Sequence, residues 1–166
     1  GPPRLVRAAV DAFGGLDILV NNVGAVTPRT GGFLSVTDDD WLTTLTINFL
    51  AAVRTTRAAL PHLLDRGTGV VVTVNSVNAR LPDPLVIDYS AAKAALANFS
   101  KSLSKEVGPH GVRVVTVSPG PVSTGLWLGT GGVAATVAQA AGATPEAVAQ
   151  GAARESVTGR FTQPEE

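Results

Sequence analysis

The stretch GVVVTVNS, residues 69–76, decides the fold of this chain. It is a short run of mostly β-branched residues that starts at a glycine and ends in polar residues, as a buried parallel strand does. Two stretches of the same kind lie on either side of it, LDILVNN at 16–22 and VRVVTVS at 112–118. Three such strands predict a parallel sheet at the centre of the molecule.

Long helical segments separate the predicted strands. Apolar residues recur at helical spacing over residues 38–64 and 88–107, and residues 4–13 predict a further helix before the first strand. Strands that alternate with helices imply right-handed crossovers and an open sheet with helices on both faces. We therefore expect an α/β fold with a doubly wound parallel sheet.

The composition limits the class of protein and its partners. The chain has 166 residues, of which 45% are hydrophobic, and no net charge, so it can bury a core and offers nucleic acid no basic cluster. It has no cysteine, and His62 and His110 have no second ligand nearby, so we expect no metal site. No apolar run could span a bilayer and no signal peptide opens the chain, so we expect a cytoplasmic protein with no membrane partner.

Polar and glycine-rich stretches follow all three predicted strands. They are NNVG at 21–24, Ser76 with the residues after it, and SPGPVST at 118–124. Ligands of open parallel sheets bind beyond the carboxyl ends of the strands, so these stretches gather at the expected site. Taken singly, each stretch is better interpreted as an ordinary polar loop between a strand and a helix.

Tyr89, the only tyrosine of the chain, lies four residues before Lys93 in the predicted helix 88–107. Residues at this spacing share a helix face, and a neighbouring ammonium lowers the pKa of a phenol, which gives a plausible acid/base pair. Ser76 could hydrogen-bond a substrate oxygen, and Asn48 stands mid-helix although asparagine is a poor helix former. The alternative for the pair is a packed tyrosine beside a lysine that extends to solvent.

Taken together, these motifs resemble the short-chain dehydrogenase/reductase family. Ser76, Tyr89 and Lys93 have the spacing of its catalytic residues, and Asn48 falls where the family keeps a helix asparagine. NNVG is similar to its N-N-A-G strand end, with Val23 in place of alanine, and SPGPVST is similar to its P-G-x-x-x-T stretch. The resemblance covers about residues 4–125.

The resemblance implies a Rossmann-like fold and an NAD(P)-dependent oxidoreductase that interconverts a small carbonyl compound and an alcohol. Tyr89 would be the general acid or base, Lys93 would lower the pKa of Tyr89 and hold the nicotinamide ribose, Ser76 would orient the substrate oxygen, and Asn48 would hold a water in a proton relay. The implied cofactor-binding residues are Asn22, Val23, Gly24, Tyr89, Lys93, Pro119, Gly120, Val122 and Thr124.

The sequence departs from the family at both ends. The family's first strand and its glycine-rich turn T-G-x-x-x-G-x-G, which holds the cofactor pyrophosphate, have no counterpart here, and neither has its last strand. We therefore expect a single partial Rossmann domain over residues 1–166, with a core at 1–122, a substrate lid at 123–158 and a shortened end at 159–166. The choice between NAD and NADP stays open.

The predicted lid region has three features. Residues 144–155 predict a helix capped by Thr144, whereas the Gly- and Ala-rich residues 129–145 suggest a mobile segment. Leu126, Trp127 and Leu128 form either an apolar wall of the substrate pocket or a cover of the core.

Two functions follow from these observations. The first is an oxidoreductase that assembles as a homodimer or homotetramer through helices 38–64 and 88–107, both of which carry extra small residues. The second is a truncated, catalytically inactive remnant that serves as a dimerisation or interaction module. The catalytic residues favour the first function, and the missing phosphate-binding turn favours the second.

Overall fold

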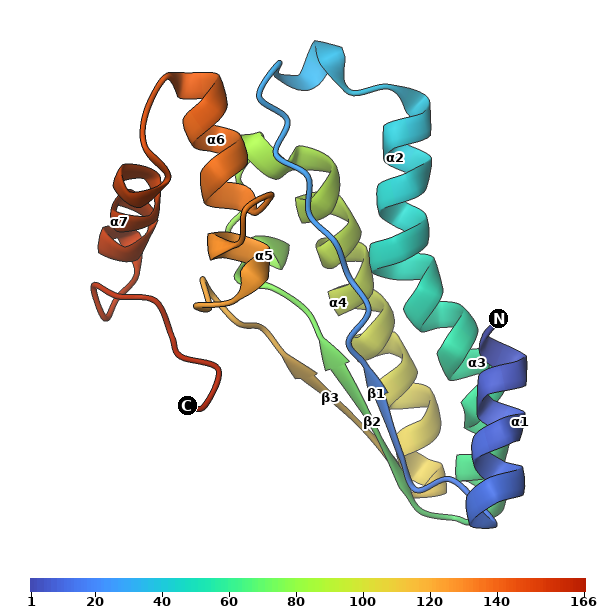
Figure 1. Ribbon diagram of the computed structural model, residues 1–166. Coiled ribbons are helices and arrows are strands. Elements are labelled where there is room, and N and C mark those ends of the chain that lie inside the picture. The colour runs from blue at the N-terminus through green and yellow to red at the C-terminus, as the bar shows by residue number, and fades with distance from the viewer.

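The computed structural model describes all 166 residues and contains one three-stranded parallel sheet. The strands β1 (Ile18–Asn21), β2 (Gly69–Val74) and β3 (Val112–Val117) lie side by side in chain order (Figure 1). All three sequence-predicted strands are present, each shorter than predicted at one end or both. Their parallel register brings the three carboxyl ends together, because Asn21 pairs with Thr73 and Val74 pairs with Val117.

The helices between the strands also follow the prediction. α1 (Pro2–Phe13) precedes β1, and α4 (Ile87–Val107) connects β2 to β3. The predicted helix 38–64 is α2 (Asp38–Leu45) and α3 (Ala51–Asp65), which continue into each other through a π-helical turn at Thr46–Leu50. α3 and α4 pack against the sheet and α1 packs on α3 (Figure 1).

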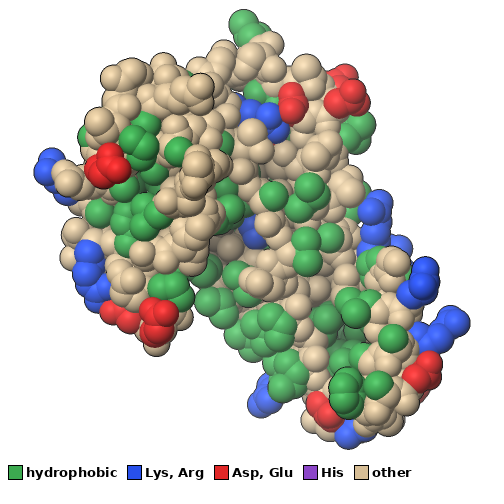
Figure 2. All heavy atoms as spheres, in the orientation of Figure 1, with side chains coloured by type: hydrophobic (Ala, Val, Ile, Leu, Met, Phe, Trp, Pro, Cys, Tyr) green, Lys and Arg blue, Asp and Glu red, His purple; other side chains and the backbone are tan.

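The hydrophobic core lies between the sheet and the helices α3 and α4. Its buried residues come from both layers and are Leu63, Val71, Leu103, Val107 and Val112. On the opposite face of the sheet, Val20, Val72 and Val115 form one row across the three strands. Val20 is 56% exposed and Val115 46% exposed, and Figure 2 shows apolar side chains over this part of the surface. The expectation of helices on both faces is therefore not met within residues 1–166: α3 and α4 cover only one face.

Three further helices follow β3. They are α5 (Gly125–Leu128), α6 (Val133–Ala141) and α7 (Pro145–Glu155), which contact one another beyond the carboxyl end of the sheet (Figure 1). The helix expected at 144–155 is confirmed, with the Thr144 hydroxyl accepting the Ala147 amide at 3.2 Å. The mobile segment expected at 129–145 is wrong, because α6 occupies most of it and buries Val133.

The rest of the chain returns to the loop after β3. Thr162 forms an isolated parallel bridge with Val122, and the Phe161 ring meets the Trp127 ring edge-on at 5.4 Å between centroids. Trp127 thus packs within the carboxyl-terminal segment, whereas Leu126 stays 50% exposed. None of the helices combines the length and the hydrophobicity needed to cross a membrane.

Candidate active site

Ser76 lies just beyond the carboxyl end of β2. It is buried and caps a short 3₁₀ turn at Val77–Ala79, where its Oγ accepts the Asn78 amide at 3.2 Å. The loop after β3 reaches the same place, because the Val77 amide donates to the Pro119 carbonyl at 3.0 Å. The convergence of the strand ends therefore puts the predicted 118–124 stretch next to Ser76.

Tyr89 and Lys93 lie on the first two turns of α4, which face the end of β2. Lys93 is only 3% exposed, and its Nζ donates to the Val74 carbonyl at 3.0 Å. The same Nζ lies 5.5 Å from the centre of the Tyr89 ring. A buried ammonium that is anchored on a strand carbonyl rules out the alternative of a lysine extending to solvent, and it fixes the tyrosine side of α4 against β2.

Burial dominates the pKa values of the pair. It lowers the pKa of Lys93 from 10.5 to about 8. It also raises the pKa of Tyr89 above its ordinary value, and the nearby Ser76 hydroxyl only partly offsets this. The Lys93 ammonium lies over the Tyr89 ring and is bonded to the Val74 carbonyl. That Lys93 lowers the pKa of Tyr89 stays a prediction.

Asn48 lies in the π-helical turn between α2 and α3, a type of distortion that is frequent at functional sites. It is 2% exposed, and its Nδ2 donates to the Ala25 carbonyl at 2.9 Å while its Oδ1 accepts the Ala25 amide at 3.0 Å. A Cβ at Gly24 would come within 3.1 Å of the Asn48 Oδ1 and 3.6 Å of the Lys93 Nζ. The glycine of the NNVG stretch therefore lets the loop after β1 approach both residues.

The remaining predicted cofactor-binding residues lie along the same edge of the sheet, but no side-chain hydrogen bond joins them to Ser76, Tyr89 or Lys93. Asn22 and Val23 are exposed at the end of β1. Gly120 follows Pro119 near Val77. Val122 pairs with Thr162, and Thr124 is exposed at the start of α5, so these two lie where the carboxyl-terminal segment joins the core.

Sequence reasoning missed a group of charged and polar residues next to Tyr89. Asp88 is 1% exposed and forms an ion pair with Arg29 from the loop after β1. Burial would raise the pKa of the Asp88 carboxyl, but hydrogen bonds from Arg29, Thr44 and the Tyr89 amide hold it below its usual range. Acidic residues are common in the first turn of a helix, because they interact favourably with the helix dipole. The only sequence signal for Asp88 was therefore its position directly before Tyr89.

A second missed residue is Asn75, which lies between Val74 and Ser76. It is 4% exposed, and neither atom of its side-chain amide has a hydrogen-bond partner. Buried amides without partners are rare in folded proteins, and they carry a cost in stability. No sequence signal distinguishes Asn75 from the polar residues that end other strands.

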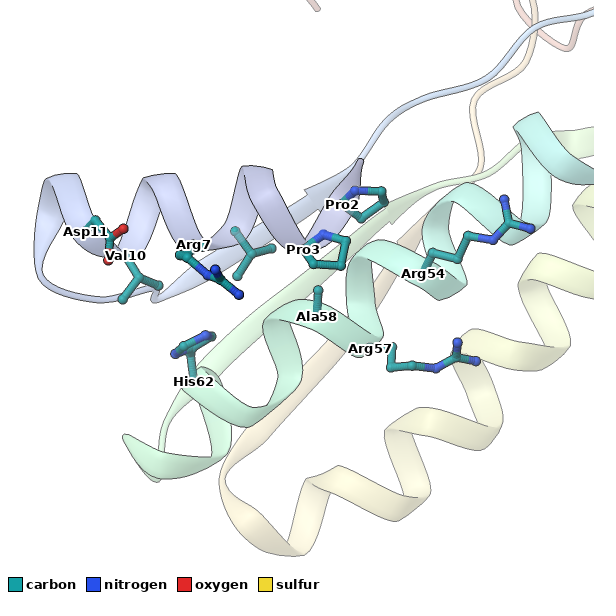
Figure 3. A pocket seen from close by; sticks show the side chains of 10 residues that line it. Pro2, Pro3, Arg7, Val10, Asp11, Arg54, Arg57, Ala58 and His62 are labelled. Carbon is teal, nitrogen blue, oxygen red and sulfur yellow. The ribbon is translucent and has the colours of Figure 1, made fainter.

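Two cavities differ in their relation to this site. The larger, about 610 Å³, lies between α1 and α3, where Arg7 and His62 face each other with Arg54 and Arg57 further along (Figure 3). It borders none of the predicted catalytic or cofactor-binding residues. The smaller, about 230 Å³, is lined in part by Asn48, Thr44 and Arg29, so it adjoins the site. No three side chains of the metal-binding types lie close enough together to hold a metal ion.

The family of the chain follows from comparison with known proteins. The family model described as short chain dehydrogenase matches residues 3–130. The chain therefore belongs to the short-chain dehydrogenase/reductase family, as the resemblance implied, and its α/β fold is a partial Rossmann-like fold.

Individual relatives extend this result. Dehydrogenase/reductase SDR family member 4 of Homo sapiens is 40% identical over 129 residues, which are 75% of this chain and 46% of that protein. Short-chain reductase protein NovJ of Streptomyces niveus is 34% identical over 161 residues, 97% of this chain and 58% of that protein.

A solved structure matches over nearly the whole chain. It is L-sorbose reductase from Gluconobacter frateurii, described as complexed with NADPH and L-sorbose, with a TM-score of 0.85 and 32% identity over 98% of this chain and 62% of that one. The chain spans about half the length of the curated relatives it matches.

Proposed function

We propose that this chain carries the proton-transfer and substrate-binding part of an NAD(P)-dependent oxidoreductase that interconverts a carbonyl compound and an alcohol. The observation that carries the proposal is the convergence of Ser76, Tyr89 and Lys93 at the carboxyl end of β2, with the Lys93 ammonium held on the Val74 carbonyl. This edge of an open parallel sheet is where ligands bind. Membership of a family of dehydrogenases and reductases supports the same reaction class.

The residues present fit the nicotinamide end of such a cofactor. An ammonium has three donors, and Lys93 uses one of them on Val74, which leaves two for ribose hydroxyls. The exposed residues Asn22 to Gly24 and the loop at 119–124 are the proposed contacts on either side. When bound, the cofactor supplies hydride-transfer chemistry, and the protein supplies position and a proton. The described residues include no glycine-rich turn for the pyrophosphate, so the choice between NAD and NADP stays open.

The proton chemistry belongs to the side chains of this chain. In the proposed reduction, the Ser76 hydroxyl orients the carbonyl oxygen and the Tyr89 hydroxyl donates a proton to it; in oxidation Tyr89 takes the proton back. Lys93, with a pKa of about 8, can take up and release protons near neutral pH. Asn48 is the proposed next member of the relay. Gly24 lies close to both Asn48 and Lys93, and Asn48 borders the smaller cavity.

Two proposals concern the rest of the molecule. The segment 123–158 is the proposed substrate lid over the core at 1–122, supported by the placement of α5 and α6 beyond the carboxyl end of the sheet (Figure 1). The outer faces of α2, α3 and α4 are the proposed surface for pairing two or four copies, because Ala91 and Ala94 are exposed there.

A second candidate function is an inactive dimerisation or interaction module. The uncovered apolar face of the sheet favours it, because a patch of this kind is typical of a surface that another polypeptide covers. The two functions differ in what Tyr89 does, since an interaction module has no use for a half-buried tyrosine beside a lysine of lowered pKa.

The test of the proposed function is Tyr89→Phe in a form of the protein that reduces a carbonyl compound with NADH or NADPH. Loss of the proton donor should lower the rate by roughly 10² or more, the usual range for general acid–base catalysis. The free energy of unfolding should stay nearly unchanged, because no backbone or packing contact is lost. A folded Tyr89→Phe variant with near-normal turnover would contradict the assignment.

A further inference from the structure

We propose that Arg29 and Asp88 are positioning residues, whose ion pair holds the first turn of α4, and with it Tyr89, against the loop that follows β1. The inference rests on the proposed function, in which Tyr89 is the proton donor. It goes beyond that function because neither residue belongs to the reacting group and neither touches Lys93 or Ser76 in the hydrogen-bond network.

The Asp88 carboxylate is the centre of the arrangement. Its Oδ2 accepts from the Arg29 Nε at 3.0 Å, from an Arg29 terminal nitrogen at 2.5 Å and from the Thr44 hydroxyl at 2.7 Å. Its Oδ1 accepts the backbone amide of Tyr89 at 3.0 Å. The carboxylate thus joins three segments that are distant in sequence and fixes the backbone of Tyr89 directly.

Arg29 is held on two more sides. Its second terminal nitrogen donates to Asp40 at 2.9 Å, and its backbone amide donates to the Leu85 carbonyl at 2.7 Å, in the turn that leads into α4. The guanidinium therefore bridges the first turn of α2 and the first turn of α4. A planar fork with several donors is suited to this bridge, and the single ammonium of a lysine is a poorer fit.

The network also reaches Asn48. Thr44, whose hydroxyl donates to Asp88, accepts the Asn48 Nδ2 on its backbone carbonyl at 3.1 Å. Asn48 and Tyr89, the two ends of the proposed relay, are therefore tied to the same buried carboxylate. A change at Arg29 or Asp88 should move both relative to Lys93, which is anchored separately on β2.

A merely stabilising ion pair would behave differently. Buried pairs can be replaced without loss of stability, so burial alone does not assign a role. What distinguishes this pair is that its Asp88 carboxylate accepts the amide of the proposed catalytic tyrosine. The chain offers a matched control in Arg66 and Asp17, an exposed ion pair of 2.9 Å far from Tyr89.

The experiment compares Arg29→Gln, Asp88→Asn and Arg29→Lys with the control Arg66→Gln. In the 166-residue chain, isotope-labelled tyrosine gives a single amide resonance, because Tyr89 is the only tyrosine. Its hydrogen exchange should be several-fold faster in Arg29→Gln and Asp88→Asn and unchanged in Arg66→Gln. In the longest form of the protein that turns over substrate, both of these variants should lower kcat roughly 10- to 100-fold with little change in KM, because a small displacement of the Tyr89 hydroxyl slows proton transfer. Arg29→Lys should recover part of the loss.

The outcomes separate the two proposals. Unchanged exchange at Tyr89 in both folded variants overturns the positioning role, and so does faster exchange with normal kcat, since the pair then serves stability alone. If Arg29→Gln does not fold, Asp88→Asn, which keeps the shape of the side chain, decides. If the unaltered protein has no turnover in any form, the proposed function fails, and the exchange comparison still decides whether the pair fixes Tyr89.

Discussion

The two faces of the sheet are made of the same residue types and have opposite surroundings. On one face, Val71 and Val112 are 1% and 0% exposed under α3 and α4. On the other, Val20 and Val115 are 56% and 46% exposed and no helix covers them. The valines of one strand alternate between the two faces, so an apolar stretch predicts burial on both.

One face therefore contributes to the stability of the chain, whereas the other is a surface that a partner could contact. The covered face carries the core, and the buried Asn48, Ser76 and Lys93 lie near the carboxyl end of the sheet. The uncovered face is an apolar patch, which soluble monomers seldom expose over a large area. We therefore expect the same change to have unequal effects on the two faces.

The largest expected effect is that of a charge placed on either face. Val71→Lys would bury an unpaired ammonium in the core, which costs several kcal/mol and should leave the chain unfolded or close to it. Val20→Lys should cost much less, because its side chain reaches water. Urea denaturation of both variants measures the contrast, and similar losses of stability would show that the second face is covered in solution.

The next effect concerns the lysine that is already buried on the covered side. The folded chain keeps the Lys93 proton only below a pH of about 8, whereas the unfolded chain keeps it up to a pH of about 10.5. The unfolded state therefore holds more protons between these values, and the free energy of unfolding should rise as the pH increases from 8 towards 10. Lys93→Met should remove this rise and stabilise the chain at pH 7 by up to about 3 kcal/mol.

Thermal or urea unfolding across this pH range checks the prediction. Lys101→Met, at an exposed position of the same helix, is the control and should leave the stability at pH 7 almost unchanged. The measurement should stop near pH 10, because the raised pKa of Tyr89 favours the unfolded state at higher pH. A Lys93→Met chain that is less stable at pH 7 would contradict the burial cost.

The smallest effect on stability concerns the surface used for assembly. Ala94→Arg adds a long charged side chain to the exposed face of α4 and should change the stability of one chain by no more than about 0.5 kcal/mol. If copies pair through the helices, this change should reduce the light-scattering mass to that of one chain, and Val20→Lys should not. The reverse result would assign pairing to the uncovered sheet face.

Much of the fold follows from local patterns. Runs such as Gly69–Val74 predicted every strand, and the capping signals around Thr144 predicted α7 to the residue. The spacing of Ser76, Tyr89 and Lys93 indicated the family that the comparison confirmed. The Gly- and Ala-rich composition of residues 129–145 did not predict α6. This helix is stabilised by the burial of Val133 and Ala138, which depends on the packing of other segments against it.

The amino-acid sequence by itself determined the elements, their order and the family of this protein, because hydrophobic periodicity and turn residues act over short stretches of chain. Only the tertiary structure decided which face of the sheet is covered, that burial raises the pKa of Tyr89 and lowers that of Lys93, and that Arg29 meets Asp88. Burial and ion pairing depend on groups brought together from distant parts of the chain, and no local pattern encodes their distance.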